Sequence, residues 1–547
     1  MKQTEYLYLT EPRNHQREAV NVSLNWLEEN NFFAYYMEQG TGKSKTLIDV
    51  ASHLFRTDRI DAAMLIAPNG VHEQWANEQL PEHSPLPYST YEWEGMPKSE
   101  IKLNRLRQFC WSTDRRMLRW FCVNIEAFSV DSGMKVFQSF VKRNRVAIIV
   151  DECTTIKNTG AKCTINVGHG LSELMMNGKY VTKVNPYSAY RFVLTGTMVT
   201  NNPFDQYSYG EFLCPGIWGM NEYRFRARYG MITRMKYGKK PNGKDNMVRK
   251  QMSKDMIARI HRQIADGFRI EDIAYKNFTS TDVVLWMKSH PDVSVPYKNL
   301  GELKEKIKPW SFICKKSECL DLPEKQHLIT NYEMSKEQKE VYNDLVRDFY
   351  AQYGDEEIEV TIKLALMTRL SQVTGGFFPY YDDGSAKAMP IKGNGKFKAL
   401  ERCIEETDER PLIVVARFTA EIEMIMEEFG AEGLYGKTKD RNAVRERFQS
   451  NEIDILAVNP DVGCMGYNFQ NSCNMFIYSN DFSLLKREQM EDRIHRDGQR
   501  SDHVIYRDLI AKGTVDERIY EVLRLKKDLL DFMRDVKNVG EFVGGRK

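Results

Sequence analysis

The chain has 547 residues, of which 42% are hydrophobic and 28% are charged, and its formal net charge is only +2. This composition is typical of a soluble globular protein, and the length predicts about two to four domains. The apolar runs are shorter than the roughly 18 residues that a membrane span needs, so we expect no membrane partner, and any nucleic-acid surface must be local.

A glycine-rich segment lies between the first predicted strand and the first long predicted helix. Residues 31–37 (NFFAYYM) form a short aromatic run of strand type, and residues 44–55 (SKTLIDVASHLF) have the apolar spacing of a helix. A helix that begins in this way points its N-terminus at the preceding loop, where an anion is favoured. The candidate ligands of a nucleoside triphosphate are Gly40, Thr41, Gly42, Lys43 and Ser44.

The chemistry of this segment predicts an ATP site that uses Mg²⁺. Gly40 and Gly42 allow the backbone to wrap the phosphates, Lys43 reaches the β- and γ-phosphates, and the Ser44 hydroxyl ligates Mg²⁺. Met37 stands at the first glycine position of the general pattern, so the match is incomplete. The alternative is a chance Gly-Lys-Ser sequence in a loop.

A second predicted strand ends in two carboxylates. Residues 145–152 (RVAIIVDE) place Asp151 and Glu152 at a strand end, where parallel sheets deliver side chains to a ligand. Asp151 is predicted to hold Mg²⁺, and Glu152 to orient and deprotonate the attacking water. A further strand-type run follows at 190–194.

The middle of the chain carries a basic segment. Thirteen Lys and Arg residues lie from Arg224 to Arg262, and only Asp245 and Asp255 oppose them, with a predicted turn at 241–243. Interleaved aromatic residues make this segment a candidate for binding a phosphate backbone, and a solvated charged face is the alternative. The lysines that we assign to DNA are Lys236, Lys239, Lys240 and Lys244.

A second α/β lobe is predicted farther along the chain. Strand-type apolar runs recur at 411–416, 453–458 and 475–478, with helical spacing between them. Arg493 and Arg496 lie three residues apart on a helix-like stretch, which places them on one face. Their alternative role is a surface ion pair with nearby acidic residues.

The end of the chain reads as one more helix. Residues 514–534 contain apolar Ile519, Val522, Leu523 and Leu530 at helical spacing. We expect this helix to brace back onto the first lobe.

Motifs in a fixed order make the chain similar to superfamily 2 helicases, and more narrowly to Swi/Snf-family ATPases. The resemblance covers roughly residues 12–525. The segments that carry it are 12–27 (PRNHQREAVNVSLNWL), 65–75 (LIAPNGVHEQW), 151–158 (DECTTIKN), 194–202 (LTGTMVTNN), 322–325 (LPEK), 412–419 (LIVVARFT), 463–469 (GCMGYNF) and 489–499 (QMEDRIHRDGQ).

The resemblance implies roles for residues that chemistry alone does not assign. Gln16 resembles the glutamine that reads adenine, and Thr154 stands where the family has a histidine that couples hydrolysis to lobe motion. The further implied residues are Gly466 at the nucleotide, Gln489, Arg493 and Arg496 in catalysis, and Asn69 and Arg417 on DNA.

The implied fold class is α/β, with two RecA-like lobes and a basic, partly helical insertion between them. We expect the first lobe at 1–215, the insertion at 216–310, the second lobe at 311–511 and the bracing helix at 512–547.

The implied function is an ATP-dependent motor that translocates on or remodels double-stranded DNA. One alternative is a helicase that unwinds branched or forked DNA in replication, recombination or repair, and another is a DNA-binding scaffold without hydrolysis. The expected location is the cytoplasm of a prokaryotic or virus-infected cell, or the nucleus of a eukaryote.

Overall fold

The computed structural model of the protein describes residues 4–171, 174–176, 179–181, 190–196, 203–239, 245–293, 295–353, 360–382, 385–464 and 467–524. The chain divides into two compact units, Met1–Lys315 and Lys316–Lys547. Each unit is built around its own parallel sheet, so the prediction of an α/β protein with two lobes is confirmed. Within the described residues, no helix combines the length and apolar character required to cross a membrane.

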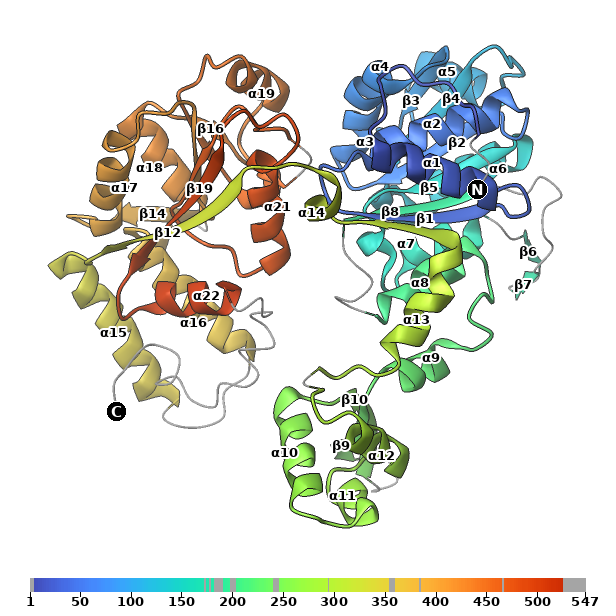
Figure 1. Ribbon diagram of the computed structural model, residues 1–547. Coiled ribbons are helices and arrows are strands. Elements are labelled where there is room, and N and C mark those ends of the chain that lie inside the picture. Colours follow the sequence, from blue (N-terminus) through green and yellow to red (C-terminus); the bar gives the residue numbers. More distant parts are fainter. Residues whose placement is uncertain are drawn as a thin grey trace. The chain divides into compact units, whose positions relative to one another are not determined.

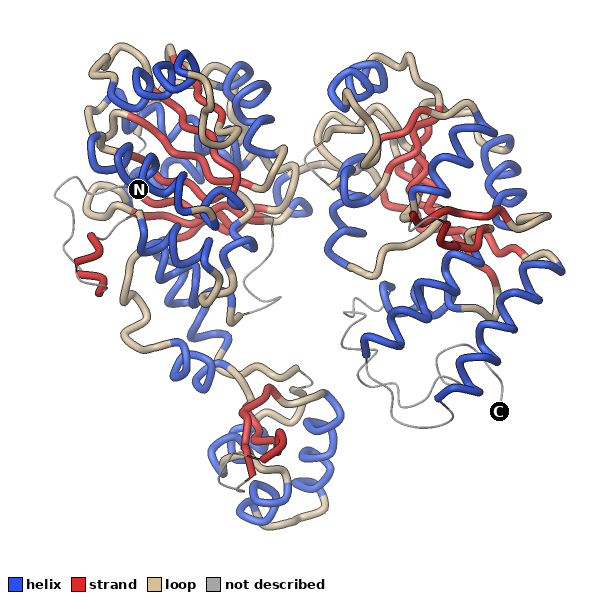
Figure 2. The backbone as a smooth tube through the Cα atoms, turned by 180° about the vertical axis from the view of Figure 1, so that it is seen from behind, coloured by secondary structure: helices blue, strands red, loops and turns tan. Residues whose placement is uncertain are grey.

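The first unit contains a seven-stranded sheet in the order β11-β1-β8-β5-β2-β4-β3, and every pairing is parallel. Its strands are β1 Phe32–Met37, β2 Ala62–Ala67, β3 Tyr88–Glu92, β4 Leu118–Asn124, β5 Val146–Val150, β8 Tyr190–Thr195 and β11 Ser311–Cys314. The central strands β1, β2 and β5 are buried along their whole length, because helices cover both faces of a parallel sheet (Figure 2).

The helices of the first unit connect these strands (Figure 1). They are α1 Asn14–Trp26, α2 Lys43–Arg56, α3 Val71–Gln74, α4 Leu80–His83, α5 Glu100–Trp111, α6 Asp131–Arg143, α7 Lys162–Ile165, α8 Asp205–Leu213, α9 Glu222–Tyr229 and α13 Leu300–Ile307. One large cluster of buried apolar residues from both strands and helices forms the core of this unit.

Residues 311–314 belong to the first sheet, whereas the sequence analysis placed them in the second lobe. They form β11, which pairs in parallel with β1 from Ala34↔Ser311 to Met37↔Cys314. The second unit begins at Lys316, so the predicted boundary at 311 lies too early, because residues 311–314 form an edge strand of the first sheet.

The segment between α9 and α13 folds as a hairpin with three helices and a core of its own. Its elements are β9 Ile232–Lys239, β10 Asp245–Gln251, α10 Lys254–Ala265, α11 Ile270–Lys276 and α12 Thr281–Ser289. The two strands pair antiparallel, as expected for a hairpin, and the predicted turn at 241–243 lies outside the described residues. Buried Met231, Met252, Ile260, Val284 and Met287 belong to its core. We call residues 231–297 the insertion.

The chain enters and leaves the insertion through adjacent backbone segments. The Met231 amide donates to the Pro296 carbonyl at 3.0 Å, and the Lys298 amide donates to the Tyr229 carbonyl at 3.0 Å. Gly230 and Tyr297 form an antiparallel bridge at the same place. The insertion is therefore joined to the rest of the first unit by a two-stranded neck.

The second unit contains a six-stranded parallel sheet in the order β12-β19-β18-β15-β17-β16. Its strands are β12 Glu324–Tyr332, β15 Leu412–Val415, β16 Glu432–Leu434, β17 Ile455–Val458, β18 Asn474–Ile477 and β19 His503–Ala511. Its helices are α14 Lys316–Cys319, α15 Lys336–Tyr353, α16 Val360–Thr374, α17 Gly395–Glu405, α18 Thr419–Phe429, α19 Arg441–Gln449, α20 Pro460–Gly463, α21 Leu484–Ile494 and α22 Val515–Arg524.

The last described helix, α22, packs against other helices of the second unit, and the expected bracing of the first lobe stays a prediction. Ile519, Val522 and Leu523 are buried in one cluster with residues of α15 and α16. The Val515 amide also donates to the Tyr342 hydroxyl at 2.9 Å. The apolar face predicted from the sequence is thus covered by this unit's own helices, and Leu530 lies outside the described residues.

Candidate functional site

The loop between β1 and α2 passes through the left-handed region of backbone conformation. Gly40 has φ 83° and Gly42 has φ 84°, which glycine adopts without strain. Lys43 is the first residue of α2, and its ammonium donates to the Met37 carbonyl at 3.0 Å. Met37 is the buried last residue of β1, so it replaces the usual glycine before the loop begins to turn. The N-terminus of α2, which includes Ser44, faces this loop and suits an anion.

Helix α1 contacts the same loop through two side chains. Nε2 of His15 lies 2.8 Å from the Thr41 carbonyl, and Nε2 of Gln16 donates to the same carbonyl at 3.1 Å. The other end of the Gln16 amide accepts from the Arg13 amide at 2.9 Å. A Cβ atom on Gly42 would come within 2.1 Å of Nε2 of Gln16, so this close approach requires glycine. Gln16 therefore lies directly beside the predicted phosphate loop.

The two predicted carboxylates follow β5, and the sheet brings them close to the loop. Strand β8 lies between β1 and β5, so the residues after all three strands meet at one edge of the sheet. Asp151 is 9% exposed, and its Oδ1 accepts from the Glu152 amide at 2.9 Å. The Glu152 carboxylate accepts from the hydroxyls of Thr154 at 3.0 Å and Thr195 at 3.4 Å.

Glu152 has an unusual backbone conformation. Its φ of 51° lies in the left-handed region, which a residue with a side chain occupies at a cost of about 1–3 kcal/mol. Strain of this kind is retained where the surrounding structure needs it, and here it turns the chain sharply after β5. Thr154, for which the resemblance implies a histidine position, donates its hydroxyl hydrogen bond to Glu152 across this turn.

Burial raises the pKa of both carboxyl groups above their ordinary values. For Asp151 and Glu152 alike, the positive charge of Lys43 acts in the opposite direction and lowers the pKa. The Asp151 charge raises the pKa of Glu152 further. Two partly desolvated carboxylates beside a single lysine form a site that favours an additional cation.

Trp75 is a residue of this site that the sequence analysis did not assign. Its indole Nε1 donates to Oδ2 of Asp151 at 2.8 Å, so each oxygen of that carboxylate accepts a hydrogen bond. Trp75 is 1% exposed and begins a π-helical turn, Trp75–Gln79, that follows α3. Such turns often occur at functional sites, because the extra residue redirects a side chain.

In the second unit, the two predicted catalytic arginines contact one segment. Arg493 is buried in α21 and donates through Nη2 to the Cys464 carbonyl at 2.5 Å. Arg496 follows α21 and donates to Oδ1 of Asn468. Both guanidinium groups therefore lie against residues that flank 465–466.

The other predicted residues of this unit differ in what the structure describes. Gln489 lies on α21, one turn before Arg493, and is partly exposed. Gly466 lies outside the described residues, so its predicted role at the nucleotide stays a prediction.

A buried ion pair that the sequence analysis did not identify fixes α21 on the sheet. The Arg487 guanidinium donates to both carboxylate oxygens of Asp508 on β19, at 2.6 and 2.9 Å, and also to Glu491 at 2.8 Å. Asp508 is fully buried, and breaking such a pair by removing one partner leaves an uncompensated charge. The pair therefore holds in place the helix that carries Gln489 and Arg493.

The candidate DNA residues on the two lobes lie just after strands. Asn69 is exposed and follows β2, immediately before Gly70 at the start of α3. Arg417 follows β15, and its guanidinium lies 3.8 Å from the centre of the Phe482 ring and 5.0 Å from that of Phe418. Burial lowers the pKa of Arg417. It is held between two rings in this structure.

Two of the four candidate lysines lie on the described part of the hairpin. Lys236 and Lys239 lie on β9, whereas Lys240 and Lys244 lie outside the described residues. Their contact with DNA stays a prediction.

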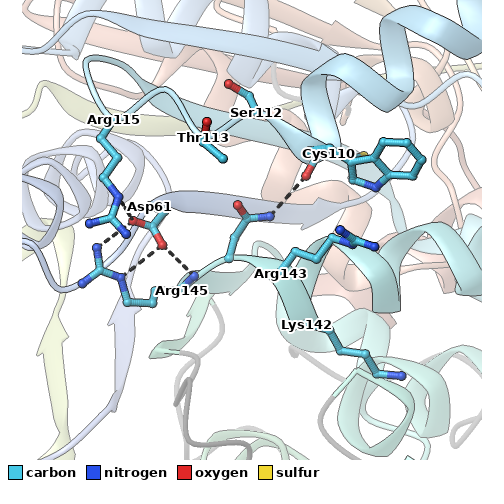
Figure 3. A pocket seen from close by; sticks show the side chains of 10 residues that line it. Asp61, Cys110, Ser112, Thr113, Arg115, Lys142, Arg143 and Arg145 are labelled. Atoms are coloured by element: carbon cyan, nitrogen blue, oxygen red, sulfur yellow. Dashed lines mark hydrogen bonds and ion pairs between the residues drawn. The ribbon is translucent and has the colours of Figure 1, made fainter.

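A cavity of about 600 Å³ lies in the first unit but away from these residues. Figure 3 shows Arg115 and Arg145 directed at Asp61. Asn144 also lines the cavity. Asp61 and Arg145 precede β2 and β5, so the cavity lies at the sheet edge opposite the phosphate loop. Asn144 and buried Arg119 donate to carbonyls in the last turns of α6 and α5. The lining cations Arg115 and Arg145 instead pair with Asp61.

Residues 15–374 match the SNF2-related domain, and residues 395–498 match the helicase conserved C-terminal domain. One curated relative, the CHD3-type chromatin-remodeling factor CHR7 of Arabidopsis thaliana, is 28% identical over 222 residues, which are 38% of this chain and 18% of that protein. The TATA-binding protein-associated factor mot1 of Aspergillus fumigatus is 22% identical over 409 residues, which are 72% of this chain and 20% of that protein. The chain thus spans about a fifth of the length of these relatives.

Among solved structures, the Sulfolobus solfataricus SWI2/SNF2 ATPase core in complex with dsDNA is 17% identical. The superposition covers 97% of this chain and 95% of that one, with a TM-score of 0.38.

Proposed function

The chain belongs to the SNF2-related family, and on that premise we propose that it is an ATP-dependent motor that translocates on or remodels double-stranded DNA. One observation carries the proposal. The glycine loop with Lys43 and the carboxylates of Asp151 and Glu152 meet at one edge of the first sheet, on either side of β8. This is the arrangement that phosphoryl transfer to water requires, because it combines a phosphate cradle, a metal carboxylate and a base.

The residues of the first unit fit ATP and Mg²⁺. The loop passes through the left-handed region at Gly40 and Gly42, as a loop that wraps phosphates requires, and the two carboxylates beside Lys43 favour an additional cation. Ser44 and Asp151 would hold Mg²⁺, which when bound supplies charge neutralisation at the β- and γ-phosphates.

The chain's own groups then have separate roles in hydrolysis. Lys43 binds the phosphates, and Gln16 binds adenine from its position beside Thr41. Glu152 orients water and accepts its proton, and the hydroxyls of Thr154 and Thr195 hold that carboxylate in position.

The second unit contributes charge to the transition state. Arg496 and Arg493 would offset the charge that develops on the γ-phosphate, with Gln489 beside them on α21. This part of the proposal is supported by family membership and by the rigid anchoring of α21 through Arg487 and Asp508.

Unwinding of branched or forked DNA is a second candidate function. It is favoured by the antiparallel hairpin of β9 and β10, which is an element of the kind that can separate strands.

A steady-state ATPase assay tests these functions together. Duplex, single-stranded and forked DNA and an equal mass of RNA are compared as activators, and we expect duplex DNA to stimulate more than RNA. Lys43→Ala should abolish turnover, whereas Glu152→Gln should retain ATP binding and lose hydrolysis, because only the base changes.

Each other outcome identifies a different function. Stimulation by RNA that equals or exceeds that by duplex DNA would identify an RNA-dependent motor, and preferential stimulation by forks would favour unwinding. No turnover in the parent protein would leave a scaffold that binds DNA.

A further inference from the structure

The insertion exposes aromatic rings on one of its helices and the loops that flank it. Tyr275 is 83% exposed, Phe278 is 53% exposed and Phe268 is 47% exposed. Phe268 precedes α11, Tyr275 lies in its last turn and Phe278 follows it. Burial of a large aromatic ring is favourable, and a ring left in water forgoes that stabilisation. Three exposed rings around one short helix therefore indicate a surface that another molecule covers.

The backbone at Phe278 makes this surface more unusual. The Phe278 amide donates to the Tyr275 carbonyl at 3.2 Å, and the Thr279 amide donates to the Ala274 carbonyl at 3.0 Å. This pair of bonds is the helix ending in which glycine is preferred at the left-handed position. Phe278 occupies that position with φ 49°. A bulky side chain that is both strained and exposed does not serve the stability of the fold.

The strained residue is attached to the base of the hairpin. The Thr233 hydroxyl donates to the Asn277 carbonyl at 2.8 Å, and the Thr279 hydroxyl donates to the Ile232 carbonyl at 2.9 Å. Ile232 and Thr233 are the first residues of β9, the strand that carries Lys236 and Lys239. The backbone of Phe278 is therefore fixed relative to the start of the hairpin.

The charge of the insertion indicates which kind of molecule covers the rings. Residues 231–297 contain thirteen Lys and Arg against seven Asp and Glu, a net charge of +6, so the rest of a chain of net charge +2 carries −4. The Lys276 ammonium lies 5.2 Å from the centre of the Phe268 ring. Most of the cations lie at 234–262, whereas residues 266–282, which carry the rings, hold two cations against four acidic residues. The rings can therefore offer a surface on which bases stack, and the hairpin offers the cations that pair with phosphates.

We propose that Tyr275 and Phe278 form a stacking platform for unpaired bases of DNA, beside the basic hairpin that binds the adjoining backbone. The platform rests on the proposed function in taking DNA as the partner. It adds a contact with unpaired nucleotides to a motor whose lobes are assigned to the duplex. A flat ring can stack on any base, so the platform should bind without strong sequence preference.

The test uses the full chain and fluorescence anisotropy with a labelled oligothymidylate of about 16 nucleotides. Phe278→Gly should weaken binding about 10-fold while the melting temperature stays equal or rises, because glycine adopts the left-handed conformation without strain. Tyr275→Ala should weaken binding to a similar extent. The matched control is Ile101→Ala, since Ile101 is 84% exposed on α5, outside the insertion.

The outcomes separate this proposal from the proposed function. Parent affinity in both Phe278→Gly and Tyr275→Ala overturns the platform and assigns the exposed rings to a protein partner. An equal loss in Ile101→Ala also overturns it, because the effect would not be specific to these rings. ATPase stimulation of the parent by duplex DNA is measured on the same preparation, and its absence contradicts the motor without changing the result for the platform.

Discussion

The carboxylate of Asp151 illustrates how single hydrogen bonds shape the candidate site. One oxygen accepts from the backbone of Glu152 and the other from the indole of Trp75, so the side chain has little freedom to rotate. Groups that hold a metal carboxylate commonly change metal affinity or activity by about 10–100-fold when they are removed. Trp75 is therefore a positioning residue in this site.

Trp75→Phe should raise the Mg²⁺ concentration needed for half-maximal ATPase activity and lower turnover about 10-fold at limiting Mg²⁺. The change removes one N–H donor and retains most of the buried ring. Titration of Mg²⁺ in the ATPase assay measures the Mg²⁺ concentration for half-maximal activity. Binding of a fluorescent ADP analogue without Mg²⁺ should be unchanged.

Trp120→Phe is the matched control for this prediction. The Trp120 ring packs on Trp75 with 6.0 Å between ring centres, and its Nε1 has no hydrogen-bond partner among the residues that the structure describes. An equal effect of Trp120→Phe would mean that packing matters here, rather than the bond to Asp151.

The sequence reveals local chemistry at this scale but not contacts between distant residues. The roles of Gly40, Lys43 and Asp151 could be predicted from the residues next to them in the sequence, because each lies just after an apolar run of strand type. Trp75 lies 76 residues before Asp151 and appears in the sequence as one more apolar residue of a helix. The Arg487–Asp508 pair is likewise invisible until α21 packs on β19.

At the scale of elements, the strands predicted from the sequence were β1, β5, β8, β15, β17 and β18, and the fold of the insertion was not predicted. Strands buried on both faces read as short continuous apolar runs, as in β5, β15 and β17, and such runs have few alternatives. The insertion buries one face of each small helix and exposes charge on the other, so its pattern resembles that of a solvated segment. An edge strand such as β11 has a weak signal for the same reason, because its exposed Ile313 interrupts the run of buried residues.

The hairpin of the insertion carries a prediction about salt. Replacing Lys236, Lys239, Lys240 and Lys244 with Ala should weaken DNA binding and make the slope of log K against log salt shallower by about one per lost phosphate contact, since fewer counterions are released. Binding isotherms at several salt concentrations measure this slope. ATP turnover without DNA should not change, because the nucleotide residues lie on other elements. A slope equal to that of the parent would mean that the lysines form only a solvated face.

At the scale of the whole molecule, the chain distributes its chemistry over two compact units. Apart from Gly466, the residues assigned to ATP binding lie in the first unit, and the arginines assigned to the transition state lie in the second. Because of this division, changes in the first unit should affect ATP binding and changes at the arginines should affect kcat, and steady-state kinetics can distinguish the two effects.

Arg496→Ala should lower kcat by on the order of 10³, with KM for ATP nearly unchanged. Arg493→Ala should lower kcat less and also lower the melting temperature, because this side chain is buried and donates to the Cys464 carbonyl. ATPase kinetics and thermal unfolding of the two variants provide the comparison. A rise in KM with kcat retained would assign these arginines to substrate binding instead.

The two-stranded neck of the insertion has a consequence for how such a chain can change over generations. Because the backbone departs at Met231 and returns at Pro296 as hydrogen-bonded neighbours, the gap that any replacement must bridge is the spacing of adjacent strands, about 5 Å. A segment of any length whose two ends lie side by side can replace the insertion at this position without changing a strand of the first sheet. Selection can therefore replace the insertion while the first sheet and the candidate site at its edge are inherited unchanged.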